Sequence, residues 1–310
     1  MVVQTKNLVK RYGDLIALDH LSLNVREGEI FGLLGPNGSG KTTAINCILS
    51  LLKYDKGDIQ IFGKPMRPDA YGIKRDIGII MQNVAVFEEL TVIENINYFC
   101  GLYIKDKAEL KRLVEEALEF VGLEDFRKFY PKKLSGGLLR RLNIACGIAH
   151  KPRLIILDEP TVAVDPQSRN RILEGIVKLN EQGATVIYTS HYMEEVEQIC
   201  SRIVILDKGR VIASGTKEEL KAMITLGEKI TVETFSIRDE HLAALRKISG
   251  VNSAEYTEKL LVIKSDKGKN NLEVVLNFLK THGIGFGRIY SELPTLNDVF
   301  LEITGKQLRD

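Results

Sequence analysis

Residues 35–43, GPNGSGKTT, contain the pattern G-x-x-x-x-G-K-[ST] in full. The apolar segment 29–35 predicts a buried strand before this pattern, and the apolar spacing in 42–52 predicts a helix after it. A glycine-rich loop between a strand and a helix turns its backbone amides inward, where they bind phosphate. These residues therefore predict a phosphate-binding loop, the P-loop, formed by Gly35, Pro36, Asn37, Gly38, Ser39, Gly40, Lys41, Thr42 and Thr43.

Two side chains of the P-loop add a positive charge and a metal ligand. In loops of this kind, the lysine reaches the β- and γ-phosphates, and the hydroxyl of the next residue ligates Mg²⁺. Those positions are Lys41 and Thr42 in this chain. The sequence therefore predicts that the loop binds ATP together with Mg²⁺.

The apolar segment LIILDEP (154–160) carries two carboxylates, Asp158 and Glu159, at its end. At the tip of a buried strand, Asp158 is placed to hold the magnesium shell through a water molecule. Glu159 is placed to polarise the attacking water, and a base of this kind accelerates a reaction by about 10²–10⁴. The alternative is a pair of solvated acids that begin a turn before Pro160. Beside a complete P-loop, we expect the magnesium and water-activating roles.

A second glycine-rich stretch, the LSGG segment (134–137), precedes a predicted helix over 138–149. Ser135, Gly136 and Gly137 would offer a hydroxyl and exposed amides at the start of that helix, which is a second anion-binding arrangement. Because one ATP needs a single P-loop, the second site suggests a nucleotide held by another copy of the chain in a two-fold dimer. From these residues alone, an ordinary serine N-cap with a glycine turn remains an open alternative.

The elements around these motifs fall into two regions. Short apolar runs in 1–26 predict an antiparallel sheet, and strands at 154–158 and 185–191 with a helix between them predict a parallel α/β core. The pattern is helical from about 90 to 150. After about residue 225, the order of strands and helices predicts a small βαββαβ domain. We therefore expect an α/β protein with a small α+β domain at the C-terminal end.

The composition is that of a soluble globular protein, with 44% hydrophobic and 27% charged residues. The net charge of +2, without any block of like charges, indicates no nucleic-acid partner. No apolar run approaches the roughly 20 residues of a membrane helix, and the first residues lack the apolar centre of a signal peptide. We therefore expect a chain in the reducing cytosol. Buried reduced thiols are expected at the four cysteines, Cys47, Cys100, Cys146 and Cys200.

The motifs GPNGSGKT, LSGG and LIILDEP, in this order, resemble those of the nucleotide-binding subunits of ABC transporters. The resemblance covers about the first 220 residues. It implies a P-loop NTPase fold of ABC type, with an antiparallel β-subdomain, a RecA-like core and a helical subdomain at about 88–150. It also implies an ATP-binding domain at 1–224, followed by an accessory domain at 225–310.

Four further residues acquire roles through this resemblance. Tyr12 in KRYGD matches the aromatic residue that stacks on adenine, and Gln82 matches the Q-loop glutamine near Mg²⁺ and the attacking water. His191 matches the switch histidine at the γ-phosphate, and Asp165 matches the D-loop aspartate, which acts across a dimer. In the dimer so implied, each P-loop faces the partner's LSGG segment. The second ATP-binding subunit would be an identical or a paralogous chain.

The chain departs from the common family pattern at two places. Leu138 stands where many members have glutamine after LSGG, so a polar contact near the partner's ribose and phosphates is expected to be weaker. The D-loop VAVD (162–165) lacks the serine of the common SGLD or SALD, which is expected to alter communication between the two sites. Because neither change removes Lys41, Asp158 or Glu159, we still expect hydrolysis.

The segment LPTLNDVFLEITG (293–305) resembles the end of the accessory domains in one group of ABC exporters, often drug- or lipid-related. This resemblance implies an exporter subunit whose C-terminal domain strengthens the dimer or regulates it. An additional packing module is the alternative.

Together, these features predict an ATPase subunit that powers export of an unidentified substrate through separate transmembrane permease subunits. It would lie on the inner face of the cell membrane and contact the permease through residues 83–96, unless their apolar side chains are buried in the chain's own core. A soluble ABC ATPase of translation or DNA repair is the alternative, although the first type usually carries two ATPase domains and the second a long coiled coil. The chain has one P-loop and one LSGG segment, and residues 82–134 leave room for a helical subdomain only. A P-loop kinase would leave the LSGG segment and His191 without a role.

Overall fold

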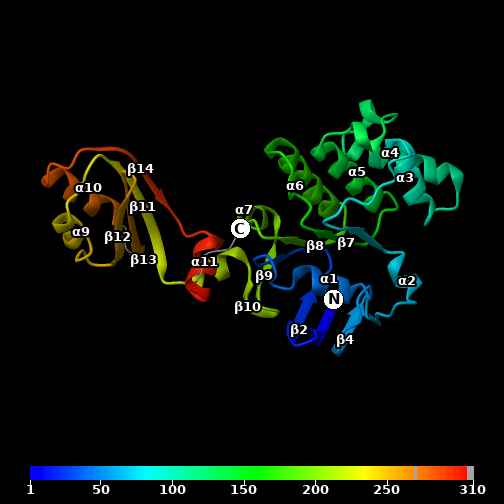
Figure 1. The fold of residues 1–310 in the computed structure, drawn as a ribbon, viewed down its shortest axis with the longest axis horizontal. Coiled ribbons are helices and arrows are strands. Elements are labelled where there is room, and N and C mark those ends of the chain that lie inside the picture. Colours follow the sequence, from blue (N-terminus) through cyan, green and yellow to red (C-terminus); the bar gives the residue numbers. More distant parts are fainter. Residues whose placement is uncertain (269–270, 306–310) are drawn as a thin grey trace. The chain divides into compact units, whose positions relative to one another are not determined.

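The computed structural model describes residues 1–268 and 271–305, which form two compact units (Figure 1). The first unit covers Met1–Lys217, and the second begins at Glu218. A short helix, α8 (Lys217–Ala222), spans the division between them. In the described part of the chain, no helix combines the length and the apolar character needed to cross a bilayer.

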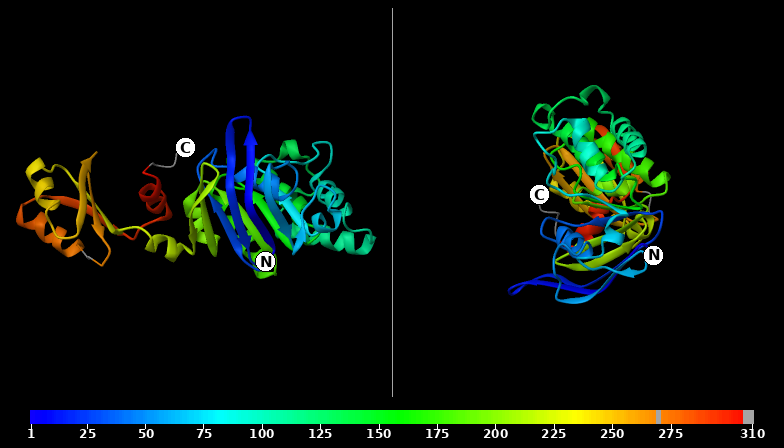
Figure 2. Two further views of the ribbon diagram at one scale, coloured as in Figure 1. Left: turned by 90° about the horizontal axis from the view of Figure 1, so that it is seen from below. Right: turned by 90° about the vertical axis from the view of Figure 1, so that its right-hand side faces the viewer.

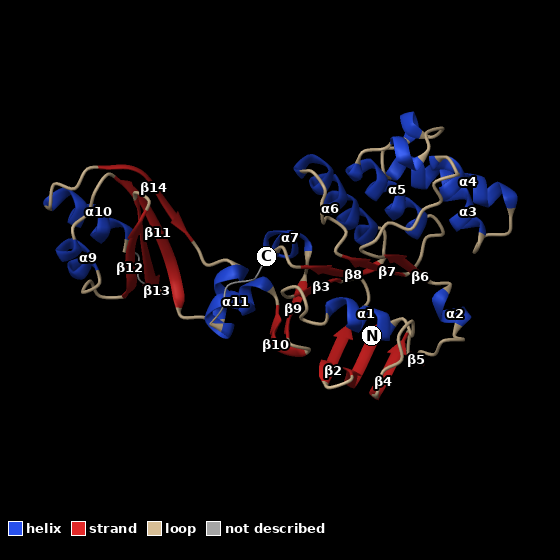
Figure 3. Cartoon of the chain, viewed as in Figure 1, coloured by secondary structure: helices blue, strands red, loops and turns tan. Residues whose placement is uncertain are grey.

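Six strands form the central sheet of the first unit, in the order β10-β9-β3-β8-β7-β6 (Figure 3). They are β3 (Ile30–Leu34), β6 (Ile77–Ile80), β7 (Leu154–Asp158), β8 (Thr185–Ser190), β9 (Arg202–Asp207) and β10 (Arg210–Gly215). Neighbours from β9 to β6 are parallel, whereas β10 is antiparallel to β9. The expected parallel α/β core is thus confirmed. Because parallel strands end at one edge of a sheet, the residues after β3, β6, β7 and β8 come together there.

Of the helices that connect or flank the parallel strands, three follow β3, β7 and β8 directly. They are α1 (Lys41–Ile48), α6 (Pro166–Glu181) and α7 (Met193–Ile199). Ala44, Ile45 and Ile48 of α1 lie in the hydrophobic core. This helix is shorter than the expected span of 42–52, because the chain turns at Ser50, whose φ is 52°.

An antiparallel sheet with the order β2-β1-β4-β5 completes the first unit. Its strands are β1 (Val3–Tyr12), β2 (Leu15–Val25), β4 (Lys56–Ile61) and β5 (Lys64–Pro65). Figure 2 shows this sheet, in blue, from two further directions. One hydrophobic core joins it to α1 and the central sheet, and Leu8, Leu21, Phe31 and Ile156 are among its buried side chains. The antiparallel β-subdomain expected from the sequence is therefore present.

Helices dominate the segment between β6 and β7, where the helical subdomain was expected. These helices are α3 (Val92–Gly101), α4 (Lys107–Phe120) and α5 (Gly136–Ile148), with 3₁₀ turns at Glu124–Phe126 and Pro131–Lys133. The short α2 (Tyr71–Lys74) precedes β6. Buried Asn95 of α3 accepts a hydrogen bond from Phe87 N at 2.8 Å and donates to Phe87 O and Leu90 O at 3.0 Å. This amide therefore anchors the loop that follows β6.

All four cysteines are free and buried, as the apolar segments around them predict. Burial raises the pKa of the Cys47 and Cys100 thiols to about 11. The thiolate is the reactive form of cysteine, so these side chains are structural rather than chemical groups.

A four-stranded antiparallel sheet with the order β12-β13-β11-β14 forms the second unit. Its elements are β11 (Leu226–Thr234), α9 (Asp239–Leu245), β12 (Val251–Thr257), β13 (Leu260–Asp266), α10 (Leu272–Thr281) and β14 (Phe286–Glu292). Val275 and Leu279 of α10 pack with Ile230 and Ile263 of the sheet in a separate hydrophobic core. The βαββαβ order expected from the sequence is confirmed.

The last helix, α11 (Leu296–Thr304), begins after Thr295, which is its N-cap. Thr295 and Asp298 form a reciprocal capping box there. Glu302 of the same helix accepts hydrogen bonds from Thr225 N and Oγ1 at 2.8 and 3.0 Å. The helix is thereby tied to the residue that precedes β11.

Candidate functional site

The P-loop runs from the end of β3 to the start of α1. Gly40 precedes Lys41 with φ at 107°, and a Cβ on Gly40 would lie 2.7 Å from the carbonyl oxygen of Ala17. Both the left-handed conformation and the close approach require glycine. No side chain of the described residues caps the first turn of α1, so its backbone N–H groups remain available to an anion.

Lys41 folds back over the P-loop toward Glu159. Its Nζ donates to the carbonyl oxygens of Gly35 at 2.8 Å and Pro36 at 3.2 Å. The same atom lies 3.1 Å from Glu159 Oε1, and the two side chains are only 4% and 7% exposed. Removing one partner of a buried ion pair leaves an uncompensated charge. Lys41 and Glu159 therefore hold each other at the edge of the sheet.

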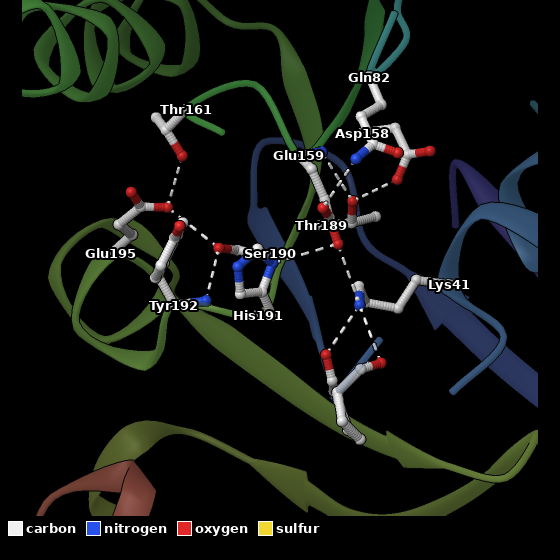
Figure 4. Close-up of polar contacts among 12 residues, drawn as sticks. Lys41, Gln82, Asp158, Glu159, Thr161, Thr189, Ser190, His191, Tyr192 and Glu195 are labelled. Carbon is white, nitrogen blue, oxygen red and sulfur yellow. Dashed lines mark hydrogen bonds and ion pairs between the residues drawn. The ribbon is translucent and has the colours of Figure 1, made fainter. Parts of the chain in front are cut away.

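Glu159 is the centre of a group of polar side chains at the strand edge (Figure 4). Gln82 Nε2 donates to Glu159 Oε2 at 3.4 Å, and His191 Nδ1 lies 3.4 Å from Glu159 Oε1. These residues follow β6, β7 and β8, whose ends lie side by side. The fold thus brings together Lys41, Gln82, Glu159 and His191, which the sequence singles out separately.

The backbone of Glu159 is held in a conformation that few non-glycine residues adopt, with φ at 49°. Glu159 N donates to Thr189 O at 3.2 Å and to Thr189 Oγ1 at 3.0 Å. Arg140 Nη2 donates to Glu159 O at 2.7 Å. Such a conformation persists only where neighbours over-determine it, and it is found most often at functional sites. Thr189 and Arg140 together fix the direction of the Glu159 carboxylate.

Asp158 is fully buried at the end of β7. Its Oδ1 accepts a hydrogen bond from Thr189 Oγ1 at 2.5 Å, whereas Oδ2 has no hydrogen-bond partner among the described residues. A buried carboxylate oxygen without a partner is costly, and a cation with its water shell would satisfy it. The hydroxyl of the exposed Thr42 and the amide oxygen of Gln82 are further ligands of the kind that Mg²⁺ accepts. These residues fit a magnesium site.

Arg140 of α5 is a site residue that sequence reasoning missed. It is 3% exposed, and burial lowers the pKa of its guanidinium. Its Nη1 donates to Met81 O at 2.9 Å and Gln82 O at 2.8 Å, and its Nε donates to Pro160 O at 2.7 Å. Arg140 therefore connects the helix after the LSGG segment to the loops that carry Gln82 and Glu159. The only sequence signal is a pair of arginines in the otherwise apolar run LLRRLNIA.

The LSGG segment packs against the start of α6. Ser135 is the N-cap of α5, and its Oγ accepts a hydrogen bond from Leu138 N at 3.3 Å. Gly137 is buried, and a Cβ there would lie 2.3 Å from Ser168 Oγ and 2.9 Å from Asp165 Oδ2. Asp165 caps α6 by accepting from Ser168 N at 2.9 Å, and this bonding lowers the pKa of its carboxyl. The segment and the D-loop therefore form one continuous surface.

The two glycine-rich loops do not bond to each other. Among the described residues, no hydrogen bond or ion pair joins the LSGG segment to the P-loop. Ser135 and Gly136 are exposed. The hydroxyl and amide groups expected to bind phosphate are therefore accessible to another molecule.

Tyr12 lies at the end of β1, where its side chain is half-exposed at 49%. Lys10 Nζ is positioned 4.9 Å from the centroid of its ring. A half-exposed ring offers a face on which a base can stack. The adenine-stacking role of Tyr12 stays a prediction.

Comparisons with known proteins agree with this geometry. Residues 18–162 match the ABC transporter family, and residues 215–304 match the C-terminal domain of DrrA1-3-like ATP-binding proteins. A linearmycin resistance ATP-binding protein of Bacillus subtilis is 40% identical over 313 residues, covering 100% of each chain. A daunorubicin resistance ATP-binding protein of Streptomyces coeruleorubidus is 36% identical, over 97% of this chain and 95% of that protein.

A solved structure of a related cassette resembles the first unit. It is the dimeric structure of a post-hydrolysis state of an ATP-binding cassette bound to ADP and Pi, with a TM-score of 0.63. The sequences are 30% identical, and the likeness covers 69% of this chain and 98% of the cassette. The chain therefore belongs to the ATP-binding subunits of ABC transporters, as an ATPase of this family with a DrrA1-3-like C-terminal domain.

Proposed function

We propose that Mg²⁺ and ATP bind at the strand edge, with the P-loop amides and Lys41 on the β- and γ-phosphates. Thr42 and Asp158 hold the metal ion, and Tyr12 stacks on the adenine. When bound, Mg²⁺ withdraws charge from the phosphate oxygens. The partnerless buried oxygen of Asp158 supports this metal site.

Glu159 is the group that orients and polarises the attacking water. Gln82 contacts one oxygen of its carboxylate, and His191 lies at the other. Both side chains therefore position Glu159, and both extend to the point where its carboxylate lies. Lys41 lies at that second oxygen as well. A triphosphate carries more negative charge than one carboxylate, so it draws the ammonium of Lys41 away and frees Glu159 for water. The convergence of these three side chains on Glu159 is the observation that carries the proposal.

Hydrolysis takes place in a head-to-tail dimer, in which the LSGG segment of each chain closes the site of the other. Three observations support this arrangement. Ser135 and Gly136 are exposed, the next residue Gly137 packs against the D-loop residue Asp165, and the LSGG segment has no bond to the P-loop of its own chain within the described residues. The related cassette bound to ADP and Pi is a dimer. The partner is a second copy of this chain or a paralogous subunit.

Separate transmembrane permease subunits dock at an apolar groove of about 300 Å³ beside the loop after β6. Its lining includes Leu49, Leu51, Ile79, Met81, Phe99 and Leu102. Leu51 and Leu102 are 59% and 62% exposed, and such apolar surface marks partner sites. The segment 83–96, which runs into the first residues of α3, adjoins the groove, and Phe87 packs there on Phe99, with ring centroids 5.8 Å apart. Some of its apolar side chains are therefore covered within the chain, while Phe87 remains 41% exposed.

Export is the direction of transport that the relatives support, since two of them are named for resistance to linearmycin and daunorubicin. An ATP-driven exporter would supply such resistance by removing the compound from the cell. The chain then lies in the cytoplasm, on the inner face of the membrane, held by its permease. The accessory domain, with limits at 225–310, strengthens or regulates the dimer.

The test is the Glu159→Gln variant, with the exposed Glu88→Gln as a matched control. Glutamine keeps the shape of the side chain but not its charge, so ATP should still bind while kcat falls by about 10²–10⁴. ATP should also hold the variant as a dimer that size-exclusion chromatography resolves. An unchanged kcat would remove Glu159 from its role. Full turnover in a strictly monomeric preparation would contradict the shared site.

A further inference from the structure

A second buried carboxylate, Glu195, contacts the residues that flank the proposed catalytic Glu159 and His191. Glu195 of α7 is 3% exposed and has no role in the site described so far. Its Oε2 accepts hydrogen bonds from the hydroxyls of Thr161 at 2.8 Å and Ser190 at 3.0 Å (Figure 4). The same oxygen accepts a third hydrogen bond, from the hydroxyl of Tyr188 at 2.7 Å. The three donors satisfy this oxygen of the buried carboxylate and join it to its neighbours in one polar network.

The three donors come from the strand ends that carry the site. Thr161 lies two positions after Glu159. Tyr188 and Ser190 are among the last three residues of β8, directly before His191. One oxygen of Glu195 therefore ties β8 to the segment after β7. Loss of that oxygen would leave three buried hydroxyls without their acceptor.

The same network fixes the residues on both sides of His191. Ser190 Oγ, which donates to Glu195, also accepts a hydrogen bond from Tyr192 N at 2.9 Å. The ring centroids of His191 and Tyr192 are 4.1 Å apart. The orientation of His191 toward Glu159 is thus set by the turn at Ser190–Tyr192, which the hydrogen bond between Ser190 and Glu195 stabilises.

The other carboxylate oxygen reaches the start of α6. Glu195 Oε1 forms an ion pair with Arg169 Nε at 3.3 Å, and the Arg169 guanidinium lies 5.0 Å from the centroid of the Tyr192 ring. Arg169 is in the first turns of α6, which Asp165 caps. The helix that begins at the D-loop is therefore connected through one side chain to the turn that presents His191.

We propose that Glu195 is a positioning residue for ATP hydrolysis, which fixes the turn that directs His191 toward Glu159 and links that turn to α6. The proposal rests on the proposed role of His191 at the γ-phosphate. In the head-to-tail dimer, the D-loop lies at the interface. A shift of the first turns of α6 is therefore passed through Arg169 and Glu195 to His191. Glu195 thus acts through His191 rather than on the reacting atoms.

Steady-state kinetics of Glu195→Gln and Glu195→Ala test the proposal, with Glu194→Gln on the exposed face of α7 as the matched control. Misplacement of a reacting group by about 1 Å costs up to 10²-fold, so kcat should fall about 10- to 100-fold in Glu195→Ala and less in the isosteric Glu195→Gln. The dissociation constant for ATP should stay within about twofold, because no P-loop contact changes. The control should match the wild type. A wild-type kcat in both Glu195 variants would overturn the proposal.

A double variant separates positioning from general support of the fold. If Glu195 acts through His191, adding Glu195→Gln to His191→Ala should lower kcat no further than His191→Ala alone. Multiplied losses would show an independent action and overturn the proposal. Arg169→Ala, on a partly exposed side chain, tests the connection to α6 without emptying the core. It should lower kcat several-fold at an unchanged melting temperature, and an unchanged kcat would overturn that connection.

The outcomes also distinguish this proposal from the proposed function. A wild-type rate in Glu159→Gln would contradict the function itself. A slow Glu159→Gln beside fast Glu195 and Arg169 variants would contradict only the positioning role.

Discussion

The P-loop and the LSGG segment are both glycine-rich turns that lead into a helix, but their polar side chains differ in burial and in partners. Lys41 contacts two loop carbonyls and Glu159, and it is almost completely buried. Ser135 is exposed and caps its own helix. The same kind of turn therefore encloses a buried lysine in one place and presents an accessible surface in the other.

The difference indicates how one chain can contribute to two sites. The P-loop has its lysine, the proposed metal ligands and the Glu159 carboxylate at one strand edge. The LSGG segment instead packs on the D-loop through Gly137 and Asp165. Arg140, one helical turn after the segment, donates to the carbonyls of Gln82 and Glu159. A chain that binds its partner's ATP with the LSGG segment would thus move a helix that also holds its own catalytic loops.

The largest expected effect is that of Lys41→Ala on the P-loop. The variant removes an ammonium that we assign to the phosphates, and charge-assisted hydrogen bonds contribute about 1.5–3 kcal/mol each. Loss of two such bonds predicts ATP binding weakened by about 100-fold or more. Titration with a fluorescent ATP analogue measures this, with the exposed Lys53→Ala as the control. Wild-type affinity in Lys41→Ala would mean that the P-loop binds phosphate through its amides alone.

The next effect is that of Ser135→Asp on the LSGG segment. Aspartate caps a helix as well as serine does, so the melting temperature should stay the same. Its charge should repel the partner's triphosphate and abolish ATP-driven dimerisation, while ATP binding to one chain is unchanged. Analytical ultracentrifugation of the variant in the Glu159→Gln background reports the dimer. If the Ser135→Asp protein still dimerises normally with ATP, the segment does not bind the partner's nucleotide.

A smaller effect is expected for alanine at the two glycines of the LSGG segment, where the two variants should differ in their free energy of unfolding. A Cβ on Gly137 would lie 2.3 Å from Ser168 Oγ, whereas the nearest atom to a Cβ on Gly136 is 3.8 Å away. Overpacking of this kind costs about 1–3 kcal/mol, so Gly137→Ala should lower the free energy of unfolding by that amount. Gly136→Ala should leave it unchanged or raise it slightly, because alanine favours a helical start.

Both glycine variants should weaken ATP-driven dimerisation, although only Gly137→Ala changes the monomer. Chemical denaturation of the monomer and sedimentation with ATP separate the two effects. Equal unfolding free energies for the two variants would show that the backbone around Gly137 can shift to accommodate a Cβ. The segment would then be loosely packed on the D-loop.

Some of the site could be predicted because the residues that define it are neighbours in the sequence. The P-loop, and the pair Asp158 and Glu159 at the end of an apolar run, carry both a structure and a role within a few residues. Ser135 could also be identified from its motif, but the neighbouring residues did not show whether it caps a helix or binds phosphate. The structure shows the cap and leaves the phosphate role to the dimer.

Other parts depend on contacts between distant segments. The run LLRRLN contains two arginines, and only the packing of α5 on the loops after β6 and β7 shows that Arg140 holds the catalytic backbone. Likewise, MEEVE contains three glutamates, and Glu195 is distinguished by hydroxyls from β8 and from the segment after β7. In the second unit, local patterns predicted the strands, whereas their order β12-β13-β11-β14 follows from pairing across the chain. Periodicity carries no information on such pairings.

The smallest expected effect concerns Leu138, the first residue after the LSGG segment. Its backbone N–H is already used by Ser135, so only its side chain can change the contact with a partner. Glutamine there would add one polar contact to the partner's ribose or phosphates, with a net gain of about 0.5–1.5 kcal/mol. The ATP-driven dimer of Leu138→Gln, measured in the Glu159→Gln background, should therefore be about 2- to 10-fold tighter. Leu138→Met keeps the site apolar and should leave the dimer unchanged. Equal dimer affinities for the two variants would place the Leu138 side chain away from the partner's nucleotide, and would restrict the accessible surface to Ser135 and Gly136.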